Sequence, residues 1–142
     1  MLKVATIILL IVLIYGAFYS VLNTFAPGLT VATTFEAVTG KSFDSIQDTG
    51  YLETLLGETS QIGIFGIAMT IGSAFILFFA FRKAEKWAWW AMLLTSLITW
   101  GYTLVRHIVI GDMQNVYMIL VGLLVALTGI MLPIKDFFGK KE

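Results

Sequence analysis

The feature that most constrains this chain is a set of four long stretches without Asp, Glu, Lys or Arg. They cover residues 4–26, 62–81, 87–105 and 116–134. A helix of about 20 apolar residues crosses a hydrocarbon core of about 30 Å. Because the backbone must satisfy its own hydrogen bonds in lipid, each stretch is expected to be helical. We therefore predict one membrane domain, residues 1–142, with spans over residues 4–26, 62–82, 87–110 and 116–134.

The composition favours lipid as the surroundings of these helices. The 142 residues are 58% hydrophobic and 13% charged, whereas a soluble domain carries about 25% charged residues. A soluble domain this small leaves too much of its surface in water to hide so many apolar side chains. The formal net charge of +0 gives no field that would attract nucleic acid. The absence of Cys excludes disulfides and thiol catalysis.

The first stretch has a second interpretation, as a secretory signal peptide, because Lys3 precedes an apolar run. The apolar core of such a peptide is about 7–15 residues long and is followed by a small-residue cleavage site. Residues 4–26 are longer than that, and no A-x-A pattern follows them. We therefore favour a membrane span.

The distribution of Lys and Arg predicts the orientation, since short cytoplasmic loops are enriched in these residues. Seven of the nine fall on the side of the two termini: Lys3, Arg82, Lys83, Lys86, Lys135, Lys140 and Lys141. The other side carries Lys41 and Arg106. We predict a multi-pass protein of the plasma membrane with both termini in the cytoplasm. Trp87, Trp89 and Trp90 are then expected in an aromatic belt at the inner interface, and Phe137 and Phe138 at the headgroups.

The segment between the first two spans, residues 27–61, is long for a connection without structure. Apolar residues recur at helical spacing before Gly40, around residues 43–46, and again over residues 51–56 before Gly57. We predict short amphipathic helices that lie on the outer surface and cover the mouth of the bundle; a mobile acidic loop is the alternative. The other connections are short, which predicts an all-α fold with an antiparallel four-helix bundle.

Each span carries small or polar residues at helical spacing. The four sets are Gly16, Ser20 and Asn23; Gly63, Gly66, Thr70 and Ser73; Thr95, Thr99, Tyr102 and Arg106; and Gly122, Ala126 and Gly129. Steps of three or four residues place each set on one helix face, and we expect these faces to turn inward. Such stripes more commonly pack helices together than bind a ligand.

Five residues are candidates for a ligand-binding site at the outer mouth of the bundle. Arg106 follows Tyr102 by one helical turn, so its guanidinium group can lie over the ring. Asn23 lies at the outer end of the first span, Glu58 precedes the second span, and His107 follows Arg106. If the polar faces turn inward, these side chains converge on a pocket for an anionic headgroup or for the head of an amphipathic ligand such as a quinone.

The alternative for Arg106 is an extended side chain that reaches the outer headgroups and pairs with Glu58 or Asp112. His107 is the only histidine, so it cannot provide paired haem ligation, and we expect it at the interface. No metal site and no cofactor are predicted. The P-loop, HExxH and nucleophile-elbow motifs do not occur in the sequence.

Three patches resemble a known group of proteins. They are Tyr15-Gly16, the FRKAEKWAWWA turn over residues 81–91 and the LPIKDFF ending over residues 132–138. They resemble small four-span membrane proteins of bacteria and archaea that are loosely DoxX-like. Such relatives are associated with quinone-linked or redox-accessory roles, but no activity is established for the group. The resemblance therefore implies no catalytic residue here.

These observations leave three predicted functions. The first is a non-catalytic accessory or assembly subunit of a membrane complex, favoured by four small-residue seams and no catalytic set. Its partners would be the lipid bilayer and either other membrane subunits or a second copy of the chain, with no nucleic acid. The second is a lipid-binding or quinone-binding protein with a polar pocket in the outer leaflet. The third is a lipid-modifying enzyme.

Overall fold

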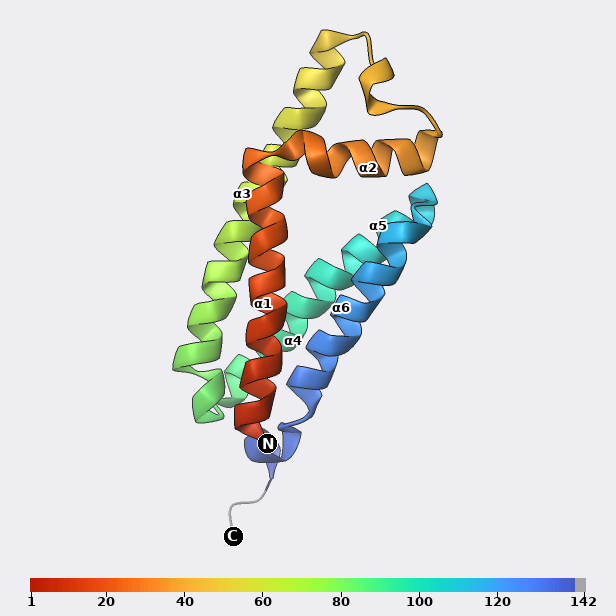
Figure 1. Ribbon diagram of the computed structural model, residues 1–142. Helices are drawn as coiled ribbons and strands as arrows, with labels where there is room; N and C mark the ends of the chain where they lie inside the picture. Colours follow the sequence, from red (N-terminus) through yellow and green to blue (C-terminus); the bar gives the residue numbers. More distant parts are fainter. Residues whose placement is uncertain (140–142) are drawn as a thin grey trace.

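The computed structural model describes residues 1–139, and every regular element in that range is helical (Figure 1). The elements are α1 (Leu2–Phe25), α2 (Pro27–Thr39), η1 (Phe43–Ser45), α3 (Thr49–Phe79), η2 (Phe81–Lys83), α4 (Lys86–Ser96), η3 (Leu97–Gly101), α5 (Tyr102–Ile110), α6 (Met113–Met131) and α7 (Ile134–Phe138).

Four helical segments in the described range are long and apolar enough to cross a membrane, which confirms that part of the prediction. They are Leu2–Phe25, Thr49–Lys83, Lys86–Ile110 and Met113–Met131. This arrangement is compatible with a multi-pass membrane protein.

Helices α1 and α3 approach closely along a seam of small residues. A methyl group on Gly63 would lie 2.7 Å from the carbonyl oxygen of Ser20 and would also overlap Thr24. A methyl group on Gly66 would collide with the Ser20 hydroxyl. Near the start of α2, the Ser60 hydroxyl donates a hydrogen bond of 3.0 Å to the Thr24 carbonyl. The small residues of α3 thus face α1, because only glycine permits this backbone distance.

Both ends of the described chain lie at the same end of the molecule (Figure 1), which we call the terminal end. The buried apolar core is concentrated there and draws on α1, α3, η2, α4, α6 and α7. Its members are Ala5, Leu9, Leu77, Ala80, Phe81, Ala88, Trp89, Met92, Leu93, Ile130 and Phe137. The large aromatic residues supply most of the buried area in such a core.

Two aromatic side chains expected near the headgroups are instead part of this core. The Trp89 indole N–H donates a hydrogen bond of 2.9 Å to the Ile130 carbonyl. The rings of Phe81 and Phe137 have their centroids 4.8 Å apart. The prediction of a surface position for Trp89 and Phe137 is therefore wrong, since the turn at η2 and the short α7 fold back over the helix ends. Trp87 is exposed, as a side chain at the headgroups would be.

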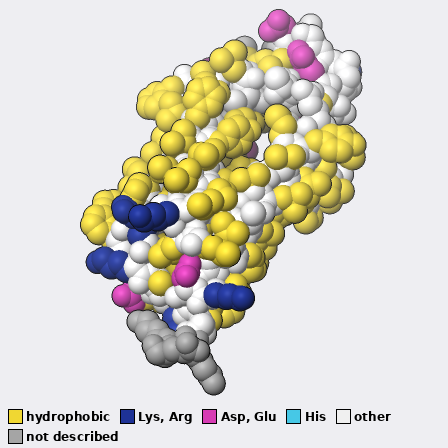
Figure 2. Space-filling model, turned by 60° about the horizontal axis from the view of Figure 1, so that its bottom comes forward, with side chains coloured by type: hydrophobic (Ala, Val, Ile, Leu, Met, Phe, Trp, Pro, Cys, Tyr) yellow, Lys and Arg dark blue, Asp and Glu magenta, His cyan; other side chains and the backbone are white. Residues whose placement is uncertain are grey.

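Basic side chains gather near the terminal end, and apolar side chains cover most of the surface beyond them (Figure 2). Arg82 and Lys83 belong to η2, Lys86 begins α4 and Lys135 belongs to α7. Lys140 and Lys141, which enter the predicted orientation, lie outside the described residues. The cytoplasmic location of this end stays a prediction.

The opposite end of the molecule, which we call the α2 end, is crossed by α2 (Figure 1). As predicted, a helix ends at Gly40, whose φ of 67° is left-handed. The expected separate helix at residues 51–56 is wrong, because these residues form the first turns of α3. The Asp48 carboxylate caps this helix by accepting a 3.0 Å hydrogen bond from the Tyr51 N–H. At 31 residues, α3 is about 46 Å long and exceeds the thickness of the hydrocarbon core.

The third long segment contains a π-helical turn, η3, between α4 and α5. A π turn takes up one extra residue and rotates the face that follows it. Tyr102 and Arg106 are consequently exposed, whereas Thr103 and His107 turn toward the other helices. The predicted inward face of this span is therefore wrong beyond Thr99.

Candidate functional site

A central cavity of about 310 Å³ lies between α1, α3, α4 and η3. Its lining is Leu9, Val12, Leu13, Gly16, Ser20, Ile62, Phe65, Gly66, Met69, Thr70, Ser73, Met92, Thr95, Ser96, Thr99 and Trp100. Most of the predicted small and hydroxyl-bearing stripes of α1, α3 and α4 are therefore found around one space.

Three of the six hydroxyl groups of this lining donate to carbonyl groups of their own helices. The Ser20 hydroxyl donates to the Gly16 carbonyl at 2.8 Å, and the Thr70 hydroxyl donates to the Gly66 carbonyl at 2.8 Å. Thr99 bonds to its own helix in the same way. Because half of the hydroxyl donors are already satisfied and the other lining side chains are mainly apolar, the cavity presents a surface suited to a mainly apolar occupant.

Two further cavities adjoin the central one. The lateral cavity, of about 460 Å³, lies between α1, η3 and α6 and is lined by Ile11, Val12, Tyr15, Trp100, Tyr117, Met118, Val121, Gly122 and Val125. The polar cavity, of about 180 Å³, is lined by Tyr15, Gly16, Tyr19, Ser20, Thr99, Trp100, Thr103, His107, Asn115, Met118 and Ile119. The first is almost wholly apolar, whereas the second contains the only histidine.

Trp100 lines all three cavities and partitions them. Its indole rests on Gly122, where a methyl group would lie 2.7 Å from the Cη2 atom. On its other side the ring stacks on Tyr15, with centroids 6.3 Å apart and an angle of 16° between the planes. The π turn sets the direction of Trp100, and the bare backbone at Gly122 makes room for it.

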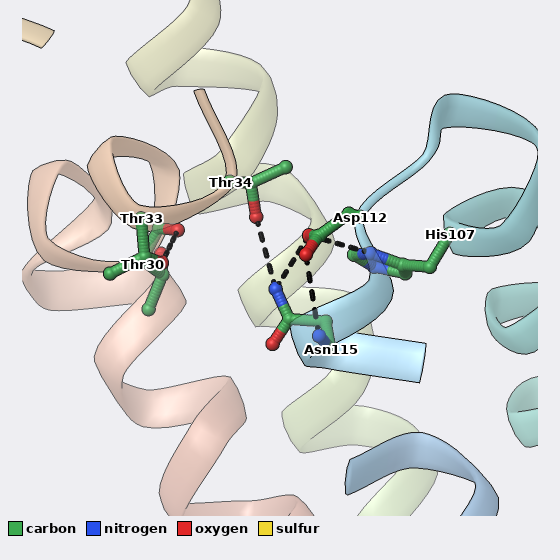
Figure 3. A network of polar contacts seen from close by, with 6 residues as sticks. All are labelled: Thr30, Thr33, Thr34, His107, Asp112 and Asn115. Atoms are coloured by element: carbon green, nitrogen blue, oxygen red, sulfur yellow. Dashed lines mark hydrogen bonds and ion pairs between the residues drawn. The ribbon is translucent and has the colours of Figure 1, made fainter. Parts of the chain in front are cut away.

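A network of polar side chains lies at the α2 end, where α5 turns into α6 (Figure 3). His107 Nδ1 and Asp112 Oδ2 are 3.0 Å apart. The Asn115 side chain donates to Asp112 Oδ2 at 2.7 Å and to the Thr34 hydroxyl of α2 at 3.5 Å. The network therefore connects the last turn of α5, the first turn of α6 and the helix that crosses above them.

The local sequence explains why these groups meet. Gly111, with a φ of 80°, ends α5 in the left-handed conformation that glycine tolerates best. Asp112 follows at once and caps α6 by accepting a 3.3 Å hydrogen bond from the Asn115 N–H. This tight turn brings the carboxylate back beside His107 and starts α6 at Met113, three residues before the predicted span.

The Asp112 side chain is completely buried. Burial by itself raises the pKa of its carboxyl group, but the hydrogen bonds from the Asn115 side chain and backbone and from His107 lower it more. The net effect is a pKa below the ordinary value of 3.8. Asp112 is therefore ionised at neutral pH, and an ionised carboxylate only accepts hydrogen bonds. His107 Nδ1 must then carry the proton in this contact.

The five residues expected to bind a ligand do not share one cavity. His107 lines the polar cavity, and its side chain is 17% exposed. Asn23 is half-buried in α1, and Glu58 is exposed on α3. Tyr102 is 67% exposed, and Arg106 is exposed without an ion pair to any described residue. The candidate site thus moves from Arg106 to the other side of α5.

Most of the residues that the sequence does not single out are placed by the π turn and by the tight turn after α5. They are Trp100, Thr103, Asp112 and Asn115, and Tyr19 joins them from α1. The Gly-Asp pair that follows Ile110 was an available signal, since Gly ends helices and Asp begins them. The four-residue step from Thr99 to Thr103 to His107 was another.

Comparisons of the chain with protein families, with curated proteins and with solved structures gave no match. The DoxX-like resemblance therefore stays a prediction. The described residues contain no group of three or more His, Asp or Glu side chains placed to hold a metal ion.

Proposed function

We propose that this chain is a plasma-membrane protein whose helices form an antiparallel four-helix bundle, and that it binds an amphipathic small molecule, a lipid or a quinone, between them. The central cavity carries this proposal. It lies between three helical segments, half of its hydroxyl groups are bonded within their own helices, and its volume of about 310 Å³ is in the range of small-molecule sites.

An apolar chain would fill this space better than water. Three of the six hydroxyl groups are bonded to their own helices, and the remaining lining consists mainly of aliphatic, aromatic and methionine side chains. An unfilled apolar space also loses the dispersion contacts that close packing provides. In a bilayer, acyl or prenyl chains are the nearest molecules able to supply those contacts.

The small-residue seams that suggested a partner chain instead pack against other helices of the same chain. Gly63 and Gly66 face α1, Gly122 accommodates Trp100, and Gly129 contacts Leu9. The observation behind the accessory-subunit prediction therefore has an intramolecular explanation. That function remains the alternative, and copurification with a second chain would favour it.

The lipid-modifying enzyme has less support. Ser20, Thr99 and Thr103 are the aliphatic hydroxyl groups that line the polar cavity together with His107. All three donate to carbonyl groups of their own helices, at Gly16, Thr95 and Thr99. Nucleophilic catalysis needs a hydroxyl that is hydrogen-bonded to its base, and the arrangement favours binding over catalysis.

The binding function is tested by filling the cavity. In Ser96→Phe a ring replaces a small side chain of the cavity lining, whereas Leu94→Phe changes an exposed position of the same helix. Native mass spectrometry after extraction in a mild detergent should show a retained apolar molecule on the wild type and on Leu94→Phe, and loss of it from Ser96→Phe. No retained molecule on any of the three would contradict the proposal.

The orientation is tested by labelling, because the natural chain contains no Cys. Ser42→Cys places a thiol at the α2 end, and Lys83→Cys places one at the terminal end. A membrane-impermeant maleimide applied to intact cells should label Ser42→Cys alone, and permeabilisation should expose Lys83→Cys. The reverse pattern would show that the termini lie outside.

A further inference from the structure

The polar cavity combines an oriented imidazole with two phenols. His107 lines it from α5, and Tyr15 and Tyr19 line it from α1. The Tyr15 ring is stacked on Trp100, whereas Tyr19 lies within electrostatic reach of Asp112. His107 Nδ1 is engaged by the buried Asp112 carboxylate at 3.0 Å. Nε2 is the remaining polar atom of the ring and the one available to a molecule in the cavity.

The contact with Asp112 determines whether Nε2 of His107 donates or accepts a hydrogen bond. The carboxylate accepts from Nδ1–H, so in the neutral imidazole Nε2 is an acceptor. Tyr19 contributes an O–H group that can donate. A hydroxyl group both donates and accepts one hydrogen bond and therefore complements this pair.

The charge of the cavity argues against an anionic head. None of the Lys and Arg residues that the structure describes lines it, and the exposed Arg106 belongs to the other side of α5. The nearest full charge is the Asp112 carboxylate, which would repel a phosphate or a fatty-acid carboxylate. An uncharged head is therefore preferred.

We propose that the polar cavity binds the neutral hydroxyl head of an apolar molecule, with the hydroxyl donating to His107 Nε2 and accepting from Tyr19. The attached chain would pass Trp100 into the lateral or the central cavity, which adjoin the head site through that side chain. This inference rests on the proposed binding function and names its ligand class: a long-chain alcohol or a hydroquinone with an apolar tail.

The test uses the fact that His107 is the only histidine. In protein labelled with ¹⁵N-histidine and placed in nanodiscs, the two imidazole nitrogens give one pair of resonances. We expect Nδ1 protonated and Nε2 bare, and we expect the Nε2 resonance to move on addition of dodecanol. A dodecyl hydroquinone should act like dodecanol if the natural ligand is a quinol and less well if it is an aliphatic alcohol. Dodecane and dodecanoate should leave Nε2 unchanged.

Matched variants separate the head site from the chain site. Tyr19→Phe removes one hydroxyl from the polar cavity and should weaken dodecanol binding about fivefold, the factor expected for one hydrogen bond. Tyr51→Phe, at an exposed position of α3 outside the three cavities, should leave it unchanged. Asp112→Asn keeps a residue that caps helices well and should abolish the fixed tautomer of His107.

Two results would overturn the head site. One is a proton on Nε2 in the unliganded wild type. The other is an unchanged Nε2 resonance while the methyl resonances of Met92 and Met118, which line the central and lateral cavities, respond to dodecanol. In the second case the proposed binding function would still stand. If neither the imidazole nor these methyl groups respond to dodecanol or dodecane, the proposed function fails as well.

Discussion

The terminal end and the α2 end of this molecule are built on different principles. At the terminal end, side chains from six elements pack together in a core that excludes solvent, and Phe81 and Ile130 are fully buried in it. At the α2 end, α5 and α6 diverge from α1 and α3 beneath α2 (Figure 1). The polar cavity and a hydrogen-bonded network take the place of a packed core there. The central cavity extends from that end to Leu9 and Met92 of the core.

The difference indicates where stability and function reside. Close packing supplies most of the stabilising contacts, so the terminal end should hold the helices together. The α2 end can then keep free space without loss of the fold. A binding site needs such space together with a few well-placed polar groups, and both are found at this end.

The largest expected effect is the loss of a core side chain at the terminal end. Phe81→Ala should lower the free energy of unfolding by about 3–5 kcal/mol, because a buried ring leaves a cavity. Trp100→Ala should cost distinctly less, since the ring already borders free space. Titration of detergent-solubilised protein with SDS, followed by circular dichroism, measures both. Phe79→Ala, at an exposed position, is the control, and equal losses at Phe81 and Trp100 would erase the contrast between the two ends.

A smaller effect is expected at the seam between α1 and α3, which runs from one end to the other. Gly63→Ala should cost about 1–3 kcal/mol, because the added methyl group meets the backbone of α1. Gly72→Ala, on the same helix but facing open space, should be neutral or slightly stabilising. The same SDS titration compares them. If the two variants behave alike, the helices are not in contact at Gly63.

The polar network of the α2 end should show a dependence on acid. Because the folded state lowers the pKa of Asp112, its contribution to stability is complete above the unfolded pKa of about 3.8 and is lost as the pH falls through the lower folded value. The groups around this carboxylate are His107 from α5, Asn115 from α6 and Tyr19 from α1. The free energy of unfolding of the wild type should therefore exceed that of Asp112→Asn at neutral pH. This difference should shrink by about 1 kcal/mol between pH 4 and the onset of acid unfolding, as followed by thermal unfolding of both proteins. A constant difference across this window would show that the carboxylate is not stabilised by its neighbours.

The smallest expected effect concerns the turn at the terminal end. Ala84 has a φ of 57°, a left-handed conformation that a residue with a Cβ atom adopts at some cost. Ala84→Gly should raise the free energy of unfolding by about 0.5–1 kcal/mol, after allowance for the greater freedom of glycine in the unfolded chain. Ala91→Gly, in the regular part of α4, should have the opposite sign. A loss of stability in Ala84→Gly would show that the left-handed conformation of Ala84 carries no such cost.

The two ends also differ in how far the sequence predicts them. The four apolar helices follow from long uncharged runs, and the end of α2 follows from Gly40, since both signals are local. Trp89 and Phe137 were misplaced because their burial depends on how η2 and α7 fold back, which is a tertiary effect. Tyr102 and Arg106 were placed on the wrong face because a π turn breaks the helical period and has no reliable local signal. The position of His107 depends on the same π turn, and its contact with Asp112 depends on the turn at Gly111.

The central claim is that the central cavity admits an apolar molecule, and the methionine methyl groups test it most directly. Met92 is 3% exposed and lines the central cavity, whereas Met131 is 43% exposed and lies outside the three cavities. In nanodiscs of deuterated lipid with protonated dodecanol, the account predicts nuclear Overhauser contacts from the alkyl chain to the Met92 methyl group, and their loss in Ser96→Phe. Contacts to Met131 without any to Met92 would contradict it, because the chain would then only coat the outside of the protein.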